Sequence, residues 1–123
     1  MRLILPWPPS TNHYWARNRN GSVRIGAAGL RFRQQTVYTC HQARIRGLTG
    51  RLSVRIEAYP PNRRRHDLDN LLKATLDALQ HGGAYKDDSQ IDRLEIERMG
   101  ITQDGGLIVS IVQLQLLHRT KGG

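Results

Sequence analysis

The sequence has almost no cysteine, and Cys40 is its single copy. One thiol cannot form an internal disulfide and cannot supply a cysteine-based zinc site. None of the five histidines lies in an H-x-H or H-E-x-x-H pattern, which disfavours a histidine zinc site as well. We therefore interpret Cys40 as a small core residue.

Long hydrophobic runs are also absent. No apolar stretch is long enough to span a bilayer, and the MRLILPWPP start lacks the apolar region of a secretory signal. Repeats, linkers and low-complexity tracts are missing too. These absences predict a cytoplasmic protein with no membrane partner. The length of 123 residues predicts a single domain, residues 1–123, with a hydrophobic core of its own.

Acidic residues are scarce in the first half of the chain. Residues 1–66 contain thirteen arginines and one acid, Glu57, whereas residues 67–123 contain six basic and nine acidic residues. With a formal charge of +9, this distribution indicates a polyanionic partner, most commonly nucleic acid. The basic residues are not gathered on one amphipathic helix, so a membrane surface is a weaker candidate.

The apolar pattern predicts two main helices and four strands. Alternation predicts strands at residues 2–5, 52–58, 94–97 and 107–117, and helical spacing predicts helices at about 27–46 and 70–80. We expect the stretch from 10 to 26 to form polar turns. The order of elements predicts an α/β (α+β) fold, with both helices packed on one mixed sheet.

Particular residues orient and end these helices. On the first helix, Leu30 and Val37, together with Cys40 or Tyr38, are expected on the inner side, and Gly47 is expected to end it. Gly82-Gly83 is expected to end the second helix. Its inner face should carry leucines at helical spacing, Leu68, Leu72, Leu76 and Leu79.

The segment PNRRRHDLDNLLKATLDAL places three arginines beside two aspartates at the start of the second helix. Inside a helix, Asp67 and Asp69 would lie about 200° apart around the axis. If Asp67 is still extended, both carboxylates can turn towards one point. Lys73 follows Asp69 by one turn. A further acidic pair, Asp87-Asp88, occupies the loop after this helix, and its approach to Asp67 stays open at this stage.

Clustered carboxylates repel one another unless a cation joins them. Mg²⁺ prefers oxygen ligands and can activate a bound water for attack on phosphorus. Lys73 would then stabilise charge in the transition state, and Arg63, Arg64 and Arg65 would hold neighbouring phosphates. This arrangement is the pattern of a metal-dependent nuclease.

Each feature also has a simpler structural interpretation. Aspartates at a helix start are ordinary caps, and arginine runs are often only solvated. Lys73 between Asp69 and Asp77 forms a plain i,i+4 charge ladder. The aromatic cluster of Trp7, Tyr14 and Trp15 is interpreted as core and loop packing rather than a base-stacking platform.

Three segments resemble one known family over nearly the whole chain: LPWPPSTNHYW, RRRHDLDNLLKATLDAL and YKDDSQI. They are similar to segments of the RusA-type Holliday junction resolvases, which are small dimeric DNA endonucleases. The resemblance implies a RusA-like fold and cleavage of four-way junctions by paired symmetric nicks during recombination and repair. It also implies a homodimer, branched DNA as partner, and Mg²⁺ as cofactor with Mn²⁺ as a substitute ion.

The resemblance also assigns roles to individual residues. It places catalytic, metal-binding carboxylates at Asp67, Asp69 and Asp88 and an essential lysine at Lys73. DNA contacts are expected from the segment before and inside the motif: Arg63, Arg64, Arg65, His66 and Asn70. His66 stands where the family often has arginine. Two other functions remain open: a metal nuclease acting on flaps or other branches, and a DNA-binding module without turnover.

Overall fold

The computed structural model describes residues 1–114. Its main feature is a four-stranded mixed sheet in the order β1-β6-β4-β5. The strands are β1 (Arg2–Leu5), β4 (Leu52–Tyr59), β5 (Ile91–Arg98) and β6 (Gly106–Gln113). Strand β4 pairs with β6 in antiparallel and with β5 in parallel orientation, while β1 pairs with β6 in antiparallel orientation.

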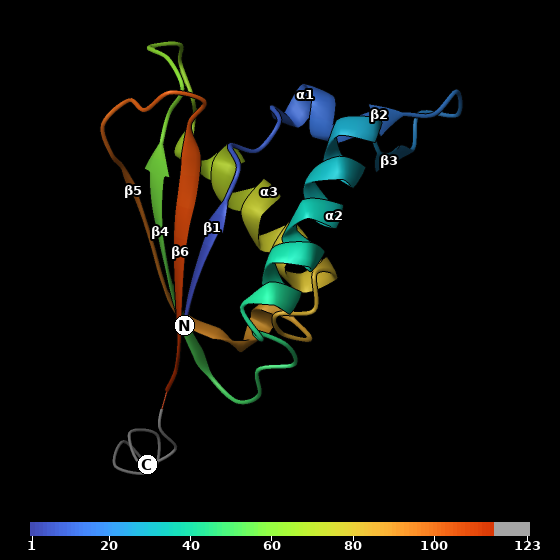
Figure 1. The fold of residues 1–123 in the computed structure, drawn as a ribbon. Coiled ribbons are helices and arrows are strands. Elements are labelled where there is room, and N and C mark those ends of the chain that lie inside the picture. Colours follow the sequence, from blue (N-terminus) through green and yellow to red (C-terminus); the bar gives the residue numbers. More distant parts are fainter. Residues whose placement is uncertain (115–123) are drawn as a thin grey trace.

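Two long helices, α2 (Ala27–Gln42) and α3 (Leu68–His81), lie on the same side of this sheet (Figure 1). Helix α3 connects β4 to β5. Parallel neighbours need such a crossover, because a tight hairpin can join only antiparallel strands. The predicted mixed sheet with two main helices is confirmed.

The core lies between the helices and the sheet, and it follows the alternation of the strands. Every second residue of β4 is buried, from Leu52 to Ala58, and β6 alternates in the same way. Cys40 is fully buried between these layers, as predicted, and burial raises the pKa of its thiol to about 11. The predicted inner face of α3 is only partly right. Leu79 is fully buried, but Leu68, Leu72 and Leu76 lie at the edge of the core and are partly buried. The buried stripe of the helix consists of Leu71, Ala74, Thr75, Ala78 and Leu79.

The predicted inner face of α2 is wrong. Leu30, Val37 and Tyr38 remain exposed, whereas the buried stripe consists of Gly29, Phe32, Thr36 and Cys40. Gly29 explains this choice. A Cβ atom there would lie 2.3 Å from the Tyr14 carbonyl oxygen, so the helix approaches its neighbour through a small residue. Close backbone contact, rather than the size of the apolar side chains, sets the orientation of α2.

Helix α2 also ends earlier than predicted, at Gln42 instead of about Arg46. Arg44 adopts a positive φ of 57°, and the N–H of Ile45 bonds to the Cys40 carbonyl at 2.9 Å. This is a Schellman ending with arginine in the position usually held by glycine. The turn places the Ile45 side chain in the core. Burial of this apolar residue favours the end of α2 at Gln42.

Helix α3 ends in the same way with the expected glycine. Gly83 has a φ of 84°, and the N–H of Ala84 bonds to the Leu79 carbonyl at 3.0 Å. The helix starts at Leu68, two residues before the predicted start, and Asp67 before it is extended, with φ −77° and ψ 128°. The condition under which both aspartates can turn towards one point is therefore met.

Four short elements were not predicted. The polar stretch after β1 forms α1 (Thr11–Tyr14) and a separate two-stranded sheet of β2 (Trp15–Arg17) and β3 (Val23–Ile25). A 3₁₀ turn, η1 (Asp88–Gln90), precedes β5. The last strand was predicted to reach Leu117, but β6 ends at Gln113 and Leu114 is not part of it; residues 115–117 fall outside the described residues. Across residues 1–114, no helix is long and apolar enough to cross a membrane.

Candidate active site

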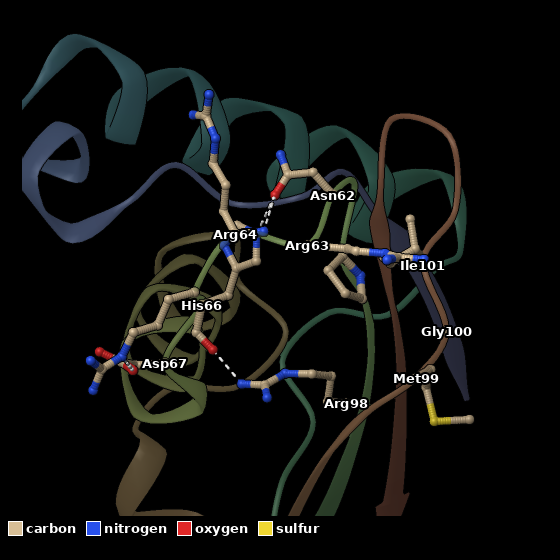
Figure 2. Close-up of a pocket in the computed structure, with 11 residues that line it drawn as sticks. Asn62, Arg63, Arg64, His66, Asp67, Arg98, Met99, Gly100 and Ile101 are labelled. Atoms are coloured by element: carbon tan, nitrogen blue, oxygen red, sulfur yellow. Dashed lines mark hydrogen bonds and ion pairs between the residues drawn. The ribbon is translucent and has the colours of Figure 1, made fainter.

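The start of helix α3 separates two recesses in the surface. The first, here the arginine recess, is drawn in Figure 2. Its lining consists of Pro60, Asn62, Arg63, Arg64, Arg65, His66, Asp67, Arg98, Met99, Gly100 and Ile101. Arg63, Arg64 and Arg65 are exposed. Three adjacent cationic side chains that keep contact with solvent are suited to binding phosphate groups.

Side-chain contacts connect the segments that line the arginine recess. Arg98, at the end of β5, donates a hydrogen bond to the backbone carbonyl of His66 (Figure 2). The His66 ring bonds to Asn62 Oδ1 at 3.0 Å and meets the Trp7 ring edge-on, with ring centres 5.0 Å apart. His66 therefore has a structural partner on each side. Arg98 was missed in the sequence because only the fold brings β5 to this loop.

Asp67 lies in the arginine recess. Its carboxylate is 3.3 Å from Arg65 Nε, with about half of the side chain exposed. An ion pair this exposed is weak, since solvent screens it. The Asp67 carboxylate is therefore readily released from Arg65 to another cation.

The second recess, here the carboxylate recess, contains three of the four residues predicted to be catalytic: Asp69, Lys73 and Asp88. Its remaining lining is Trp15, Leu72, Leu76, Asp77 and Gln80. Lys73 forms no ion pair with any residue in the described part of the chain, so the predicted charge ladder is not formed. Its ammonium group is free to meet a phosphate. Asn70, predicted to contact DNA, is exposed but lines neither recess.

Asp88 reaches the carboxylate recess because the turn that carries it is tied down. Its N–H donates to Gln80 Oε1 on α3 at 3.2 Å. The Gln90 side chain accepts from the N–H groups of Lys86 and Asp87 at 3.0 and 3.1 Å. It also donates to two backbone carbonyls, Leu48 and Gly50, both at 3.0 Å. Both polar atoms of the Gln90 amide are thus used to hold the turn.

The neighbouring carboxylates Asp87 and Asp88 have different tasks. Asp87 caps the η1 turn by accepting the N–H of Ser89 at 2.9 Å, and this hydrogen bond lowers the pKa of its carboxyl. The Asp88 side chain also interacts with Asp87, and Asp88 lines the carboxylate recess. The doubled aspartate in YKDDSQI therefore contains one structural and one candidate catalytic residue.

One wall of the carboxylate recess is a buried polar network that the sequence did not indicate. The Asp77 carboxylate accepts two hydrogen bonds from Arg33, at 2.8 and 3.1 Å, and one from the Tyr14 hydroxyl. Burial of Tyr14, together with this carboxylate, raises the pKa of its hydroxyl, which keeps its proton. Arg33 also stands 5.9 Å from the centre of the Trp15 ring. The network links helices α1, α2 and α3. The charge of Asp77 is neutralised by the ion pair with Arg33.

The donor set of the carboxylate recess suits magnesium. Within residues 1–114, no three His, Cys, Asp or Glu side chains are grouped closely enough to hold a metal ion among them. Mg²⁺ does not need such a cage, because it is commonly held by one or two carboxylates with waters and substrate phosphates. Asp69 and Asp88 provide that minimum, and Asp67 stands two residues away at the helix start.

A family model described as "Endodeoxyribonuclease RusA" matches residues 6–112. The chain belongs to the RusA family. The match spans the helices and strands from α1 to β5, and β6 except its last residue, and it includes both recesses. The predicted family, fold and enzyme class are thereby confirmed.

Individual RusA proteins agree with the family match. The chain is 39% identical over 113 residues to "Crossover junction endodeoxyribonuclease RusA" of Shigella sonnei (strain Ss046). It is 38% identical over the same length to the proteins of that name from Escherichia coli (strain K12) and Enterobacteria phage 82. Each comparison covers 91% of this chain and 93% of the relative.

Proposed function

We propose that this RusA-family protein is a Mg²⁺-dependent endonuclease that resolves four-way DNA junctions by paired nicks in recombination and repair. The single observation that carries the proposal is the carboxylate recess, where Asp69, Lys73 and Asp88 meet. It is supported by the relatives, which are crossover junction endodeoxyribonucleases similar over 91% of this chain.

The two recesses divide the work. In the arginine recess, Arg63, Arg64 and Arg65 bind phosphates of the DNA backbone. Such contacts position a nucleic acid without reading its sequence, which suits an enzyme that recognises the shape of its substrate. Because only His66 separates the arginines from Asp67, a bound backbone is brought to the start of α3.

In the carboxylate recess, the residues of the chain hold and orient the reacting phosphate. Asp69 and Asp88 would supply oxygen ligands for the ion. Asp67, which lies in the arginine recess, would have to turn away from Arg65 to add a third carboxylate. Magnesium, when bound, supplies Lewis-acid stabilisation of charge on phosphorus and a more acidic water. Lys73 directs its ammonium group at the same phosphate and stabilises the charge that develops there.

The homodimer follows from the substrate. A four-way junction has pairs of equivalent strands related by two-fold symmetry, and its resolution takes two cuts. Each chain has one set of Asp69, Lys73 and Asp88. A C2 dimer provides two such sets in opposite directions.

The test of this function compares substrates. The protein is incubated with a synthetic four-way junction, a flap and a linear duplex, each with Mg²⁺, with Mn²⁺ and with EDTA. We expect paired nicks in the junction only when a metal is present, and no cutting by the Asp69→Asn variant. Faster cutting of the flap would show that the preferred substrate is a flap and not the junction. Binding without any cutting would show that the protein is a DNA-binding module.

The dimer is tested separately. Sedimentation at micromolar concentration should give twice the mass of the chain. A mixture of wild-type and Asp69→Asn chains should nick one strand of a cruciform plasmid, where wild-type dimers cut both strands. A monomer that still makes paired cuts would contradict the dimer.

A further inference from the structure

Strands β2 and β3 and the turn between them, residues 15–25, form an arm that projects beyond α1 and α2 (Figure 1). The arm contains three exposed arginines, Arg17, Arg19 and Arg24, and no acidic residue. Within the described part of the chain, none of the three forms an ion pair. The arm therefore presents three unpaired positive charges to solvent, where they can bind an anionic partner.

The tip of the arm is ordered without a hydrophobic core. The N–H of Asn18 donates to the Ser22 carbonyl at 2.8 Å, and its side-chain amide donates to the Ser22 hydroxyl at 2.9 Å. Asn20 Oδ1 accepts the N–H of Ser22 at 3.0 Å, and Gly21 takes a φ of 87° to close the turn. An isolated two-stranded ribbon is only marginally stable. Polar bonds therefore keep this tip in one shape while its arginines stay in solvent.

The base of the arm is held by contacts with α1 and α2. Trp15 packs between the Tyr14 ring, 4.9 Å away, and the Arg33 guanidinium. At the other strand, the N–H of Gly26 bonds to the Tyr14 carbonyl at 2.8 Å. A Cβ atom on Gly26 would lie 2.8 Å from the His13 carbonyl oxygen. The direction of the arm relative to α2 is thus set by close packing.

Trp15 also connects the arm to the candidate active site. It lines the carboxylate recess together with Asp69 and Asp88. It also lines a separate recess on the arm, together with Arg17 and Val23. A continuous surface therefore leads from the candidate catalytic carboxylates to the arginines of the arm.

We infer that the basic arm binds the phosphate backbone of duplex DNA next to the scissile phosphate, on the side of the site away from Arg63, Arg64 and Arg65. Beyond its base, the arm has no aromatic side chain on which unpaired bases could stack, which favours duplex over single-stranded DNA. A two-stranded ribbon is also narrow enough for the DNA major groove. The inference rests on the proposed nuclease function and assigns it a second set of phosphate contacts.

The first test removes charge from the arm and, as a control, the same charge elsewhere. Arg17→Gln/Arg24→Gln is compared with Arg44→Gln/Arg46→Gln, whose exposed arginines follow the opposite end of α2. Junction affinity is measured in EDTA, so that cleavage does not interfere, between 50 and 200 mM salt. Thermal unfolding confirms that both variants are folded.

The arm variant should bind the junction about tenfold more weakly, and its slope of log affinity against log salt should fall by about two. The control should stay within about twofold of wild type. Equal losses in both variants would mean that net charge alone matters and would overturn the inference. Unchanged affinity of the arm variant would overturn it as well.

The second test locates the contact. Cys40 is buried, so Val23→Cys, at a position 61% exposed on the arm, provides one accessible thiol for a photo-crosslinker. The matched control is Tyr38→Cys, 66% exposed on the outer side of α2. We expect crosslinks from position 23 to duplex DNA within a few base pairs of the cleavage site, and few from position 38. Equal yields would overturn the inference, even in a protein whose junction cleavage confirms the proposed function.

Discussion

The two recesses beside helix α3 are built in opposite ways. In the arginine recess, all the candidate DNA-binding residues come from one continuous segment, Asn62–Asp67, and a second segment, residues 98–101 at the end of β5, completes the lining. The carboxylate recess is assembled from the helix, from the turn before β5 and from Trp15, which lies more than fifty residues before Asp69. A local segment is sufficient to present charge to a polymer. A set of groups that acts on one phosphate needs distant segments to be held in register.

The largest expected effect separates cutting from binding. Asp69→Asn and Asp88→Asn should each lower cleavage by about 10³-fold or more, because a metal contributes several kcal/mol of charge stabilisation. Asp67→Asn should do the same if its carboxylate joins the ion from the arginine recess. Junction affinity should be unchanged or tighter, since each substitution removes negative charge. Near-normal cleavage by any one variant removes that residue from the metal site.

Lys73 should come next. Lys73→Ala should lower the turnover number by about 10²-fold, the usual cost of losing one charged or hydrogen-bonding group at the transition state. Single-turnover cleavage at saturating protein measures this loss, and junction affinity should stay close to wild type. Lys86→Ala is the control, because Lys86 is exposed and lines neither recess. Wild-type turnover without Lys73 would reduce it to a surface charge of the helix.

The arginine recess should show the reverse pattern. Six or more phosphate contacts would make junction affinity fall by roughly 10³- to 10⁵-fold between 50 and 200 mM salt. Replacing Arg63, Arg64 and Arg65 by alanine should reduce this fall by about 40-fold, if each arginine contributes about 0.9 to the salt slope. Turnover of saturated DNA should be nearly unchanged. An unaltered salt slope would show that these arginines do not touch phosphates.

Gln90 holds the turn that carries Asp88, and its loss should have a smaller effect, on turnover and not on DNA binding. Gln90→Leu removes four hydrogen bonds around the turn and should lower turnover by about tenfold, since small displacements of reacting groups are costly. DNA affinity and its salt slope should not move. Gln113→Leu is the matched control, because Gln113 donates to Thr49 in the same loop but does not touch the Asp88 turn. Similar losses in both variants would indicate a general loosening of the loop.

The smallest effect concerns the wall behind the carboxylate recess. Tyr14→Phe removes one hydrogen bond to Asp77, which keeps both bonds from Arg33, and should lower the free energy of unfolding by about 1 kcal/mol. Thermal denaturation measures the loss. Cleavage at a temperature well below the unfolding transition should be unchanged. A large loss of activity without a loss of stability would place Tyr14 in the chemistry.

Local patterns predicted much of the fold, because they depend on neighbours in the sequence. The alternation in β4 and the Gly83 ending of α3 follow from residues a few positions apart. The orientation of α2 could not be predicted in this way. It depends on the close contact of Gly29 with the Tyr14 backbone, which lies outside the helix. The arm was missed because its order comes from polar bonds at its tip rather than from apolar periodicity.

The same distinction applies to the site. The resemblance located Asp69, Lys73 and Asp88, and the structure brings these three to one recess. Gln80 supports Asp88 but could not be identified from spacing, because only the folded chain brings the Asp88 N–H near it. Gln90 had a signal in the sequence, since Asp87 and Gln90 have the spacing of a capping box. Its bonds to the Leu48 and Gly50 carbonyls could not be predicted, because those groups lie about forty residues earlier in the chain.

The helix that carries Asp69 and Lys73 is also the crossover between the parallel strands β4 and β5, which has a kinetic consequence. Contacts between β4 and β5 are separated by about forty residues, so forming the pair requires closure of a long loop that contains α3. The turn with Asp88 immediately precedes β5 and takes its place in the same step. A newly made chain that has not completed this step carries the basic first half but no assembled carboxylate recess. Such a chain can bind DNA before it can cut it.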